Sequence, residues 1–369
     1  MSPDELRAQA AEALDGLEGF AEPWMREAFL KVPRHAFVPD MVWIWRDDAY
    51  RPLCAANDRG AWAALVHDPL ASVVTQVDDG AAETEGVLPT SSISAPDAVF
   101  TMLAAADVRP GMRALEIGTG TGYNAALLCE RAGAANVTSV EVDAGLAEAA
   151  TRRLAEAGYH PRVVVADGEG GWPPDAPYDR VLCTASLHRV PFAWVEQTRP
   201  GGLIVTPWKT TLQPHGMVRL CVSDDGASAS GHFGQPMSFM DLRGQRRPDN
   251  PLCEVYTPVS WEESRDSRTD LDLSFLDIDF HARFALGLLL PGVHWDGDGW
   301  LATADSWAYV REGGVYQWGP RDLFNELERA YRWWLEAGSP ELYDFGLTVT
   351  AGGQAAWLGD PGAVIPPSG

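Results

Sequence analysis

The segment ALEIGTGTGYNAALL (residues 114–128) constrains the fold of this chain more than any other stretch. A short apolar run leads directly into three alternating glycines, Gly118, Gly120 and Gly122, and a run of helical character follows. Glycine allows the backbone to turn tightly and to approach a ligand closely. A strand, a glycine-rich turn and a helix in this order predict a ligand-binding turn at the edge of a parallel sheet.

The residues around this segment alternate between strand and helix patterns. Helices are expected at residues 97–108, 124–133, 145–158 and 190–202, and strands at residues 113–118, 137–142, 162–167, 178–186 and 203–208. Strands that alternate with helices of this length predict an α/β fold with a doubly wound, mostly parallel sheet of the Rossmann-like kind.

Local composition and pattern along the sequence predict three regions. Residues 1–86 are expected to form an N-terminal helical cap with an inserted loop region, and residues 87–222 the Rossmann-like core. Residues 223–369 contain many aromatic side chains and are expected to form a C-terminal α+β extension. We expect this extension to recognise the substrate.

Composition excludes several classes of function. The formal net charge of −24 argues against binding to nucleic acid, which needs a basic surface. The five cysteines are dispersed without the spacing of metal ligands, so no metal site is expected. No apolar run is long enough to span a membrane, and the acidic amphipathic N-terminus does not resemble a signal peptide. These observations predict a cytoplasmic protein without membrane contact, and we expect a monomer.

The residues around the glycines limit which class of ligand the turn can bind. No lysine follows them, which excludes a phosphate-binding P-loop, and Glu116 stands two residues before Gly118. The pattern E-x-G-x-G-x-G resembles the first motif of class I methyltransferases, which use S-adenosylmethionine. That resemblance assigns Glu116 to the amino-acid end of the cofactor, and it includes Thr119 and Tyr123 in the cofactor-binding segment.

Further candidates follow the later strands of the sheet. Glu141 and Val142 end the second strand, where a carboxylate is suited to bind the two ribose hydroxyls. Asp143 is an alternative for this role. The third strand ends in Asp167 and Gly168, where the carboxylate is placed to accept from the adenine amino group, and Thr184 follows the fourth strand.

A more specific resemblance rests on several motifs in order: VPRHAFVPD, SISAP, LEIGTGTGYNAALL, DGEGGWPPDAPYDRVLCTAS and RPGGLIVTPW. Over residues 20–210 the chain resembles the protein L-isoaspartate O-methyltransferases. It departs from them in a longer connection after VPRHAFVPD, in Thr90–Ser91–Ser92 where the family has Gly-Gln-Thr, and in the C-terminal extension.

With these departures the chain resembles a subgroup of the family found with ribosomally made peptides (lanthipeptides, graspetides and lasso peptides). The resemblance implies methylation of an aspartate side chain in a modified precursor peptide, with later closure to an aspartimide and hydrolysis to isoaspartate. Two alternatives stay open, repair of isoaspartate in aged proteins and a non-catalytic peptide-binding role.

The mechanism needs few protein groups. A carboxylate is ionised at neutral pH, so its attack on a methyl group requires alignment and no general base. Hydroxyl groups suit this task, and Ser94, then Ser92 and Ser91, are the expected catalytic residues. Ser94 has an alternative role as a cap of the helix that begins near Pro96. The basic segment RGQRRP (243–248) either contacts an acidic peptide or forms a solvated loop.

Overall fold

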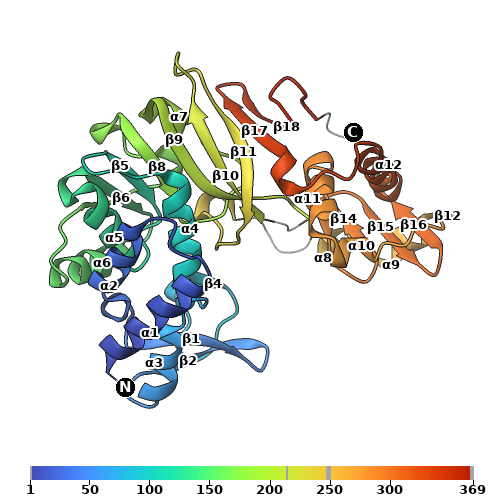
Figure 1. Ribbon diagram of the computed structural model, residues 1–369. Helices are drawn as coiled ribbons and strands as arrows, with labels where there is room; N and C mark the ends of the chain where they lie inside the picture. Colours follow the sequence, from blue (N-terminus) through green and yellow to red (C-terminus); the bar gives the residue numbers. More distant parts are fainter. Residues whose placement is uncertain (1, 213–214, 247–250, 366–369) are drawn as a thin grey trace.

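The computed structural model describes residues 2–212, 215–246 and 251–365, and a nine-stranded sheet lies at its centre (Figure 1). The five strands at one side of this sheet run parallel, and the remaining four extend it with antiparallel pairs. In spatial order the strands are β7 (Arg162–Val165), β6 (Val137–Glu141), β5 (Ala114–Ile117), β8 (Tyr178–Cys183), β9 (Thr198–Lys209), β10 (His215–Val222), β11 (Ser228–Pro236), β17 (Phe345–Thr350) and β18 (Gly353–Leu358).

The parallel part confirms the predicted doubly wound fold. All residues of β5 and β6 are buried, as expected for strands that helices cover on both faces. The helices of this part are α4 (Pro96–Ala106), α5 (Tyr123–Ala132), α6 (Ala144–Glu156) and α7 (Phe192–Gln197). The strand order reverses at β5, and open α/β sheets bind ligands outside the carboxyl ends of the strands at such a point.

The N-terminal region contains an antiparallel sheet that the sequence did not predict. Three helices, α1 (Pro3–Gly16), α2 (Pro23–Lys31) and α3 (Arg59–His67), accompany it. Its strands, in spatial order, are β2 (Ala49–Cys54), β1 (Met41–Arg46), β3 (Val73–Val77) and β4 (Pro89–Ile93). Asp47 and Asp48 both have positive φ, of 52° and 59°, as in the two-residue turns that match the twist of a hairpin.

The C-terminal region divides differently from the expected boundary at residue 222. Strands β11, β17 and β18 lie beyond that residue but continue the central sheet (Figure 1). Between β11 and β17, a five-stranded antiparallel sheet has the order β12 (Arg265–Arg268), β16 (Gly314–Trp318), β15 (Trp307–Arg311), β14 (Trp300–Ala302) and β13 (His294–Trp295). The helices here are α8 (Leu252–Val255), α9 (Pro258–Glu262), α10 (Phe275–Ile278), α11 (Phe280–Leu289) and α12 (Leu323–Glu336).

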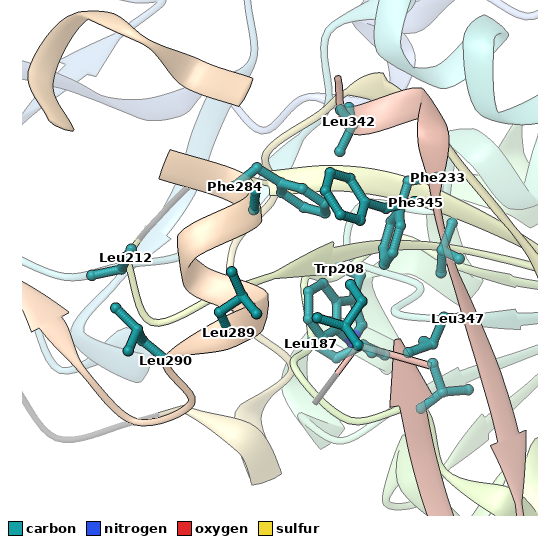
Figure 2. Close-up of a cluster of buried hydrophobic side chains, with 14 of the residues drawn as sticks. Leu187, Trp208, Leu212, Phe233, Phe284, Leu289, Leu290, Leu342, Phe345 and Leu347 are labelled. Atoms are coloured by element: carbon teal, nitrogen blue, oxygen red, sulfur yellow. The ribbon is translucent and has the colours of Figure 1, made fainter. Parts of the chain in front are cut away.

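Aromatic side chains join this C-terminal part to the central sheet (Figure 2). Phe284 of α11 lies 5.0 Å from Phe233 of β11, 6.3 Å from Trp208 of β9 and 6.2 Å from Phe345 of β17, between ring centroids. Buried aromatic contacts of this kind stabilise an interface through apolar burial and edge-to-face geometry. In the part of the chain that is described, no helix has the length and apolar character that a membrane span requires.

Candidate active site

A cavity of about 500 Å³ lies outside the carboxyl ends of β5 and β6. Three segments that are far apart in the sequence line it: the glycine turn after β5, residues 89–95 at β4, and residues 238–243 after β11. This volume lies in the usual range for small-molecule sites. The predicted glycine turn and the predicted serines therefore face the same space.

The glycine turn has a backbone that only glycine adopts readily. Gly118, Gly120 and Gly122 have φ values of 92°, 52° and 92°, all in the left-handed region. A Cβ atom on Gly120 would lie 3.5 Å from the carbonyl oxygen of Ser92 and 3.8 Å from the Ser91 hydroxyl. The turn and the serine segment thus approach each other closely. Gly118 and Gly120 line the cavity, whereas Gly122 is the N-cap of α5 and packs on Leu154.

Glu141 lies in the cavity wall where the sequence places a ribose-binding carboxylate. One carboxylate oxygen accepts a hydrogen bond from the backbone N–H of Gly120 (2.9 Å), and the other from that of Asp143 (3.1 Å). Asp143, the alternative candidate, does not line the cavity. Its carboxylate caps α6 by accepting from the N–H groups of Gly145 and Leu146. The geometry therefore favours Glu141 over Asp143.

Glu116 does not face the cavity, contrary to the expectation from the glycine motif. Its side chain is fully buried beneath the turn and accepts hydrogen bonds from Ser139 Oγ (2.5 Å) and Asn124 Nδ2 (2.7 Å). Ser139 in turn shares a hydrogen bond with Thr119 Oγ1 (2.6 Å). Burial raises the pKa of Glu116 to about 7. Glu116 therefore supports the glycine turn from below, through Ser139 and Thr119.

The other candidate residues that follow β6, β7 and β8 differ in whether they reach the cavity. Val142, Gly168 and Thr184 line it. The Thr184 hydroxyl lies 2.7 Å from the carbonyl oxygen of Gly118 and fixes the start of the turn. Asp167 is exposed outside the lining, and its carboxylate accepts from the N–H of Glu169 (3.0 Å). The predicted adenine contact of Asp167 stays a prediction.

Tyr123, the last predicted residue of the motif, has a buried ring that lines the cavity and packs on Phe37 with centroids 5.8 Å apart. Its hydroxyl has no hydrogen-bond partner among the described residues. An unpaired buried hydroxyl is costly in a folded protein. The Tyr123 hydroxyl is therefore an unpaired polar atom in the buried wall behind the cavity.

The candidate serines differ in what their hydroxyl groups contact. Ser91 is buried, and its hydroxyl accepts from Thr75 Oγ1 (3.2 Å). Ser92 and Ser94 are partly exposed in the cavity wall, and their hydroxyls have no hydrogen-bond partner within the described residues. The N-cap of α4 is Ala95, without a side-chain hydrogen bond, so the capping role considered for Ser94 is wrong. Of the three candidate serines, Ser92 and Ser94 therefore have hydroxyl groups that are available to donate a hydrogen bond to a ligand.

A buried arginine fixes this serine segment, and the sequence did not single it out. Arg34 is 4% exposed and donates to the carbonyl oxygens of Ile93 (3.4 Å) and Ser94 (3.1 Å). It also donates to Ala71 (2.8 Å) and Val66. Burial lowers the pKa of Arg34 to about 10. One side chain thus joins the N-terminal helices to the segment that lines the cavity.

The third wall was also missed by the sequence reasoning. Phe239, Met240 and Leu242 line the cavity, and Asp241 beside them forms an ion pair with Lys209 of β9. Arg243 and Arg246 complete this wall, whereas Arg247 and Pro248 of the same basic segment lie outside the described residues. The basic segment RGQRRP (243–248) was the sequence feature that pointed to this third wall of the cavity.

Comparisons with known proteins decide the family. The model of the family described as Protein-L-isoaspartate(D-aspartate) O-methyltransferase matches residues 73–243. The protein-L-isoaspartate O-methyltransferase of Methanopyrus kandleri is 37% identical over 204 residues, which cover 54% of this chain and 76% of that protein. The chain belongs to the protein-L-isoaspartate O-methyltransferase family. The corresponding protein of Pyrococcus horikoshii is 36% identical over 222 residues, 60% of this chain and 85% of that protein.

A solved structure titled protein-L-isoaspartate O-methyltransferase covers 96% of this methyltransferase, with a TM-score of 0.56 and 20% identity. This likeness shows that the chain shares the fold of that protein over most of its length. As a family member the chain is a methyltransferase that uses S-adenosylmethionine, which supplies an electrophilic methyl group when bound. The non-catalytic alternative is therefore wrong. Glu141 and the glycine turn offer hydrogen-bonding groups suited to such a polar cofactor without phosphates.

Proposed function

We propose that this methyltransferase esterifies an aspartate side chain in a ribosomally synthesised, modified peptide. The observation that carries the proposal is the pair of free hydroxyls, Ser92 and Ser94, in the wall of the cavity that the glycine turn also lines. Two neutral donors hold a carboxylate in position without a buried counter-charge that would weaken its nucleophilicity. Orientation of this kind supplies several kcal/mol to a reaction that needs no general base.

The proposed step is balanced without a proton transfer. An aspartate oxygen forms a bond to the methyl carbon, while the carbon–sulfur bond breaks and its electron pair stays on sulfur. In the resulting methyl ester, the backbone nitrogen of the following residue attacks the carbonyl carbon, loses its proton and displaces methanol. The product is an aspartimide, and water converts it to aspartate or isoaspartate.

The substrate assignment rests on the hydroxyl segment and on the sheet beside it. Thr90, Ser91 and Ser92, which the resemblance in the sequence places at the Gly-Gln-Thr of the repair enzymes, lie on β4 of the N-terminal sheet. The Thr90 hydroxyl donates to Gln76 Oε1 (2.9 Å), and the Ser91 hydroxyl accepts from Thr75. The long connection thus supports the segment that we assign to the substrate.

Repair of isoaspartate in aged proteins is the second candidate. It is favoured by the identity of 36–37% to relatives named for that activity. The solved structure of the same name that covers 96% of the chain also weakens any argument from the C-terminal extension alone.

One set of peptides separates the two candidates. The enzyme is given peptides that are identical except for aspartate or isoaspartate at one position, each in a linear form and in a cyclised form that mimics a modified precursor. Mass spectrometry follows the gain of one methyl group and then the loss of methanol. Methylation of the cyclised aspartyl peptide supports the first candidate, whereas efficient turnover of isoaspartyl peptides of any sequence contradicts it and supports repair.

A further inference from the structure

Two arginines form a cationic site at the edge of the cavity. Arg243 and Arg246 lie at the ends of one short turn after β11, and both line the cavity while remaining partly exposed. They therefore lie where the cavity meets solvent. The chain as a whole carries a formal net charge of −24, so an anionic substrate that approaches it needs a local positive site. The family match ends at residue 243, and Arg246 lies beyond it.

A carboxylate from the N-terminal region occupies this site in the structure. Asp79 forms ion pairs with Arg243 (3.2 Å) and with both terminal nitrogens of Arg246 (2.8 and 3.3 Å). Arg243 also lies 3.4 Å from Asp143. Its Nε is buried and has no hydrogen-bond partner within the described residues, so one donor of this guanidinium is unused.

The loop backbone and its hydrogen bonds present Asp79 to the arginines. Asp79 has a φ of 52° and a ψ of 29°, a left-handed conformation that aspartate adopts more readily than most residues other than glycine. Its N–H donates to Thr90 Oγ1 (3.1 Å), on the strand that continues into the candidate serines. The preceding Asp78 accepts from the N–H groups of Val87 and Leu88 and holds the loop in place.

We propose that Arg243 and Arg246 bind a second carboxylate of the peptide substrate, distinct from the one that is methylated, and that Asp79 holds this position in the free enzyme. The inference rests on the proposed peptide carboxyl methylation. Guanidinium groups bind carboxylates through paired, charge-assisted hydrogen bonds. The Asp79 side chain is 43% exposed, so a carboxylate from solution can reach the same guanidinium groups, and the exchange replaces one set of paired contacts by another.

The assignment also separates the two kinds of carboxylate. The neutral hydroxyls of Ser92 and Ser94 hold the reacting group, whose negative charge must stay available. The permanently charged arginines hold a group that does not react. The preferred substrate is therefore a peptide with an additional acidic side chain or a free C-terminal carboxylate near the methylated residue.

Three peptides test the proposal on the intact enzyme. They share one residue that accepts the methyl group. The first has a glutamate near that residue and an amidated C-terminus. The second has glutamine instead of the glutamate and an amidated C-terminus, and the third has the same glutamine and a free C-terminus. We expect KM to be about tenfold lower for a peptide with a second carboxylate, in line with one charge-assisted contact, with little change in kcat. A low KM for the glutamate peptide alone indicates a side-chain carboxylate, and a low KM for the glutamine peptide with a free C-terminus indicates a terminal one. Equal KM values for all three would overturn the inference.

Two substitutions then separate recognition from simple structural support. Arg246→Gln should raise KM for the acidic peptide and abolish the preference, whereas Asp79→Asn should lower KM for the same peptide because a competing carboxylate is removed. If the ion pairs only stabilise the loop, both substitutions will raise KM together, which contradicts the proposal. Arg246→Lys should keep part of the preference. Arg109→Gln is the matched control, since Arg109 pairs with Asp107 away from the cavity.

A binding measurement keeps this test independent of turnover. Fluorescence anisotropy of the labelled peptides, with S-adenosylhomocysteine present, reports affinity even where no methyl group is transferred. If no peptide is methylated but the acidic peptide still binds more tightly, the proposed reaction fails and the arginine site stands. If peptides are methylated but bind alike, the arginine site fails and the proposed reaction stands.

Discussion

The carboxylate of Glu141, at the end of β6, accepts a hydrogen bond from the backbone N–H of Gly120 in the turn after β5 (2.9 Å). This bond joins two neighbouring strands at the point where the sheet order reverses. It holds the turn in its left-handed conformation and keeps the carboxylate in the cavity wall. Glu141 therefore shapes the cofactor site as well as lining it.

Glu141→Ala should weaken the binding of S-adenosylmethionine. The change removes the acceptor proposed for the ribose hydroxyls and leaves the Gly120 N–H unpaired, and each such charged hydrogen bond contributes about 1.5–3 kcal/mol. Isothermal titration calorimetry should show a Kd that is higher by about ten- to a hundredfold. Asp143→Asn is the control, because Asp143 caps α6 outside the lining. A larger effect in Asp143→Asn would assign the ribose role to that residue.

Ser94→Ala and Ser92→Ala should each reduce kcat/KM while leaving the melting temperature unchanged. Both hydroxyls lack a hydrogen-bond partner within the described residues, so their removal breaks no contact of the free enzyme. Loss of one hydrogen bond to a charged substrate group corresponds to about ten- to a hundredfold in rate. Ser91→Ala should have a smaller kinetic effect, because Thr75 already contacts that hydroxyl. Equal losses in all three variants would refute the distinction between free and occupied hydroxyls.

The buried Glu116 should make stability depend on pH. Burial raises its pKa from 4.5 to about 7 in the folded protein, so the folded state binds the proton more tightly than the unfolded state. The contribution of Glu116 to stability is fully present below pH 4.5 and is lost as pH rises to about 7.

Glu116→Gln should remove that pH dependence, because an amide does not ionise. The difference in unfolding free energy between the two proteins, from urea titrations at several pH values, should change by an amount on the order of 3 kcal/mol across this interval. A difference that is constant with pH would show that the Glu116 pKa is not raised.

Arg34→Met should reduce both stability and substrate affinity. Four backbone carbonyls lose their donor, and buried unpaired acceptors cost about 1–3 kcal/mol each, so we expect a loss of a few kcal/mol in urea unfolding. Because two of these carbonyls belong to Ile93 and Ser94, KM for the peptide should rise as well. Arg131→Met is the control, since Arg131 donates to the carbonyl of Val108 outside the cavity lining. It should lower stability with KM unchanged.

The sequence predicted the parallel part of the sheet because each strand there is an apolar run with its own flanking turn and helix. Strand β2 contains Arg51 and Pro52 and reads locally as a loop, and it becomes a strand only by pairing with β1. The role of β17 depends on pairing with β11, more than a hundred residues earlier, for which no local pattern exists.

The residues of the candidate site also differ in whether a local sequence pattern identifies them. The glycine turn, Glu141 and the serines carry local patterns, so the sequence located them. The prediction that Glu116 faces the cofactor was wrong, because a sequence motif identifies the residue but not the direction of its side chain, which here bonds to Ser139. The residues from Phe239 to Leu242 reach the cavity only through the path of the chain after β11, and no short-range pattern reports it.

The pairing of β11 with β17 has a consequence for how the protein can be rebuilt. Gly231 of β11 faces Leu347 of β17, and His232 faces Gly346, so the chain leaves the sheet and returns to it at adjacent positions. Residues 237–344 are thus a single excursion from one hairpin. Segments whose ends lie close together are the ones that tolerate exchange between proteins. A chimaera that keeps residues up to 246 and from 345 onward would retain the cavity wall and all strands of the central sheet, with a different domain in place of the excursion.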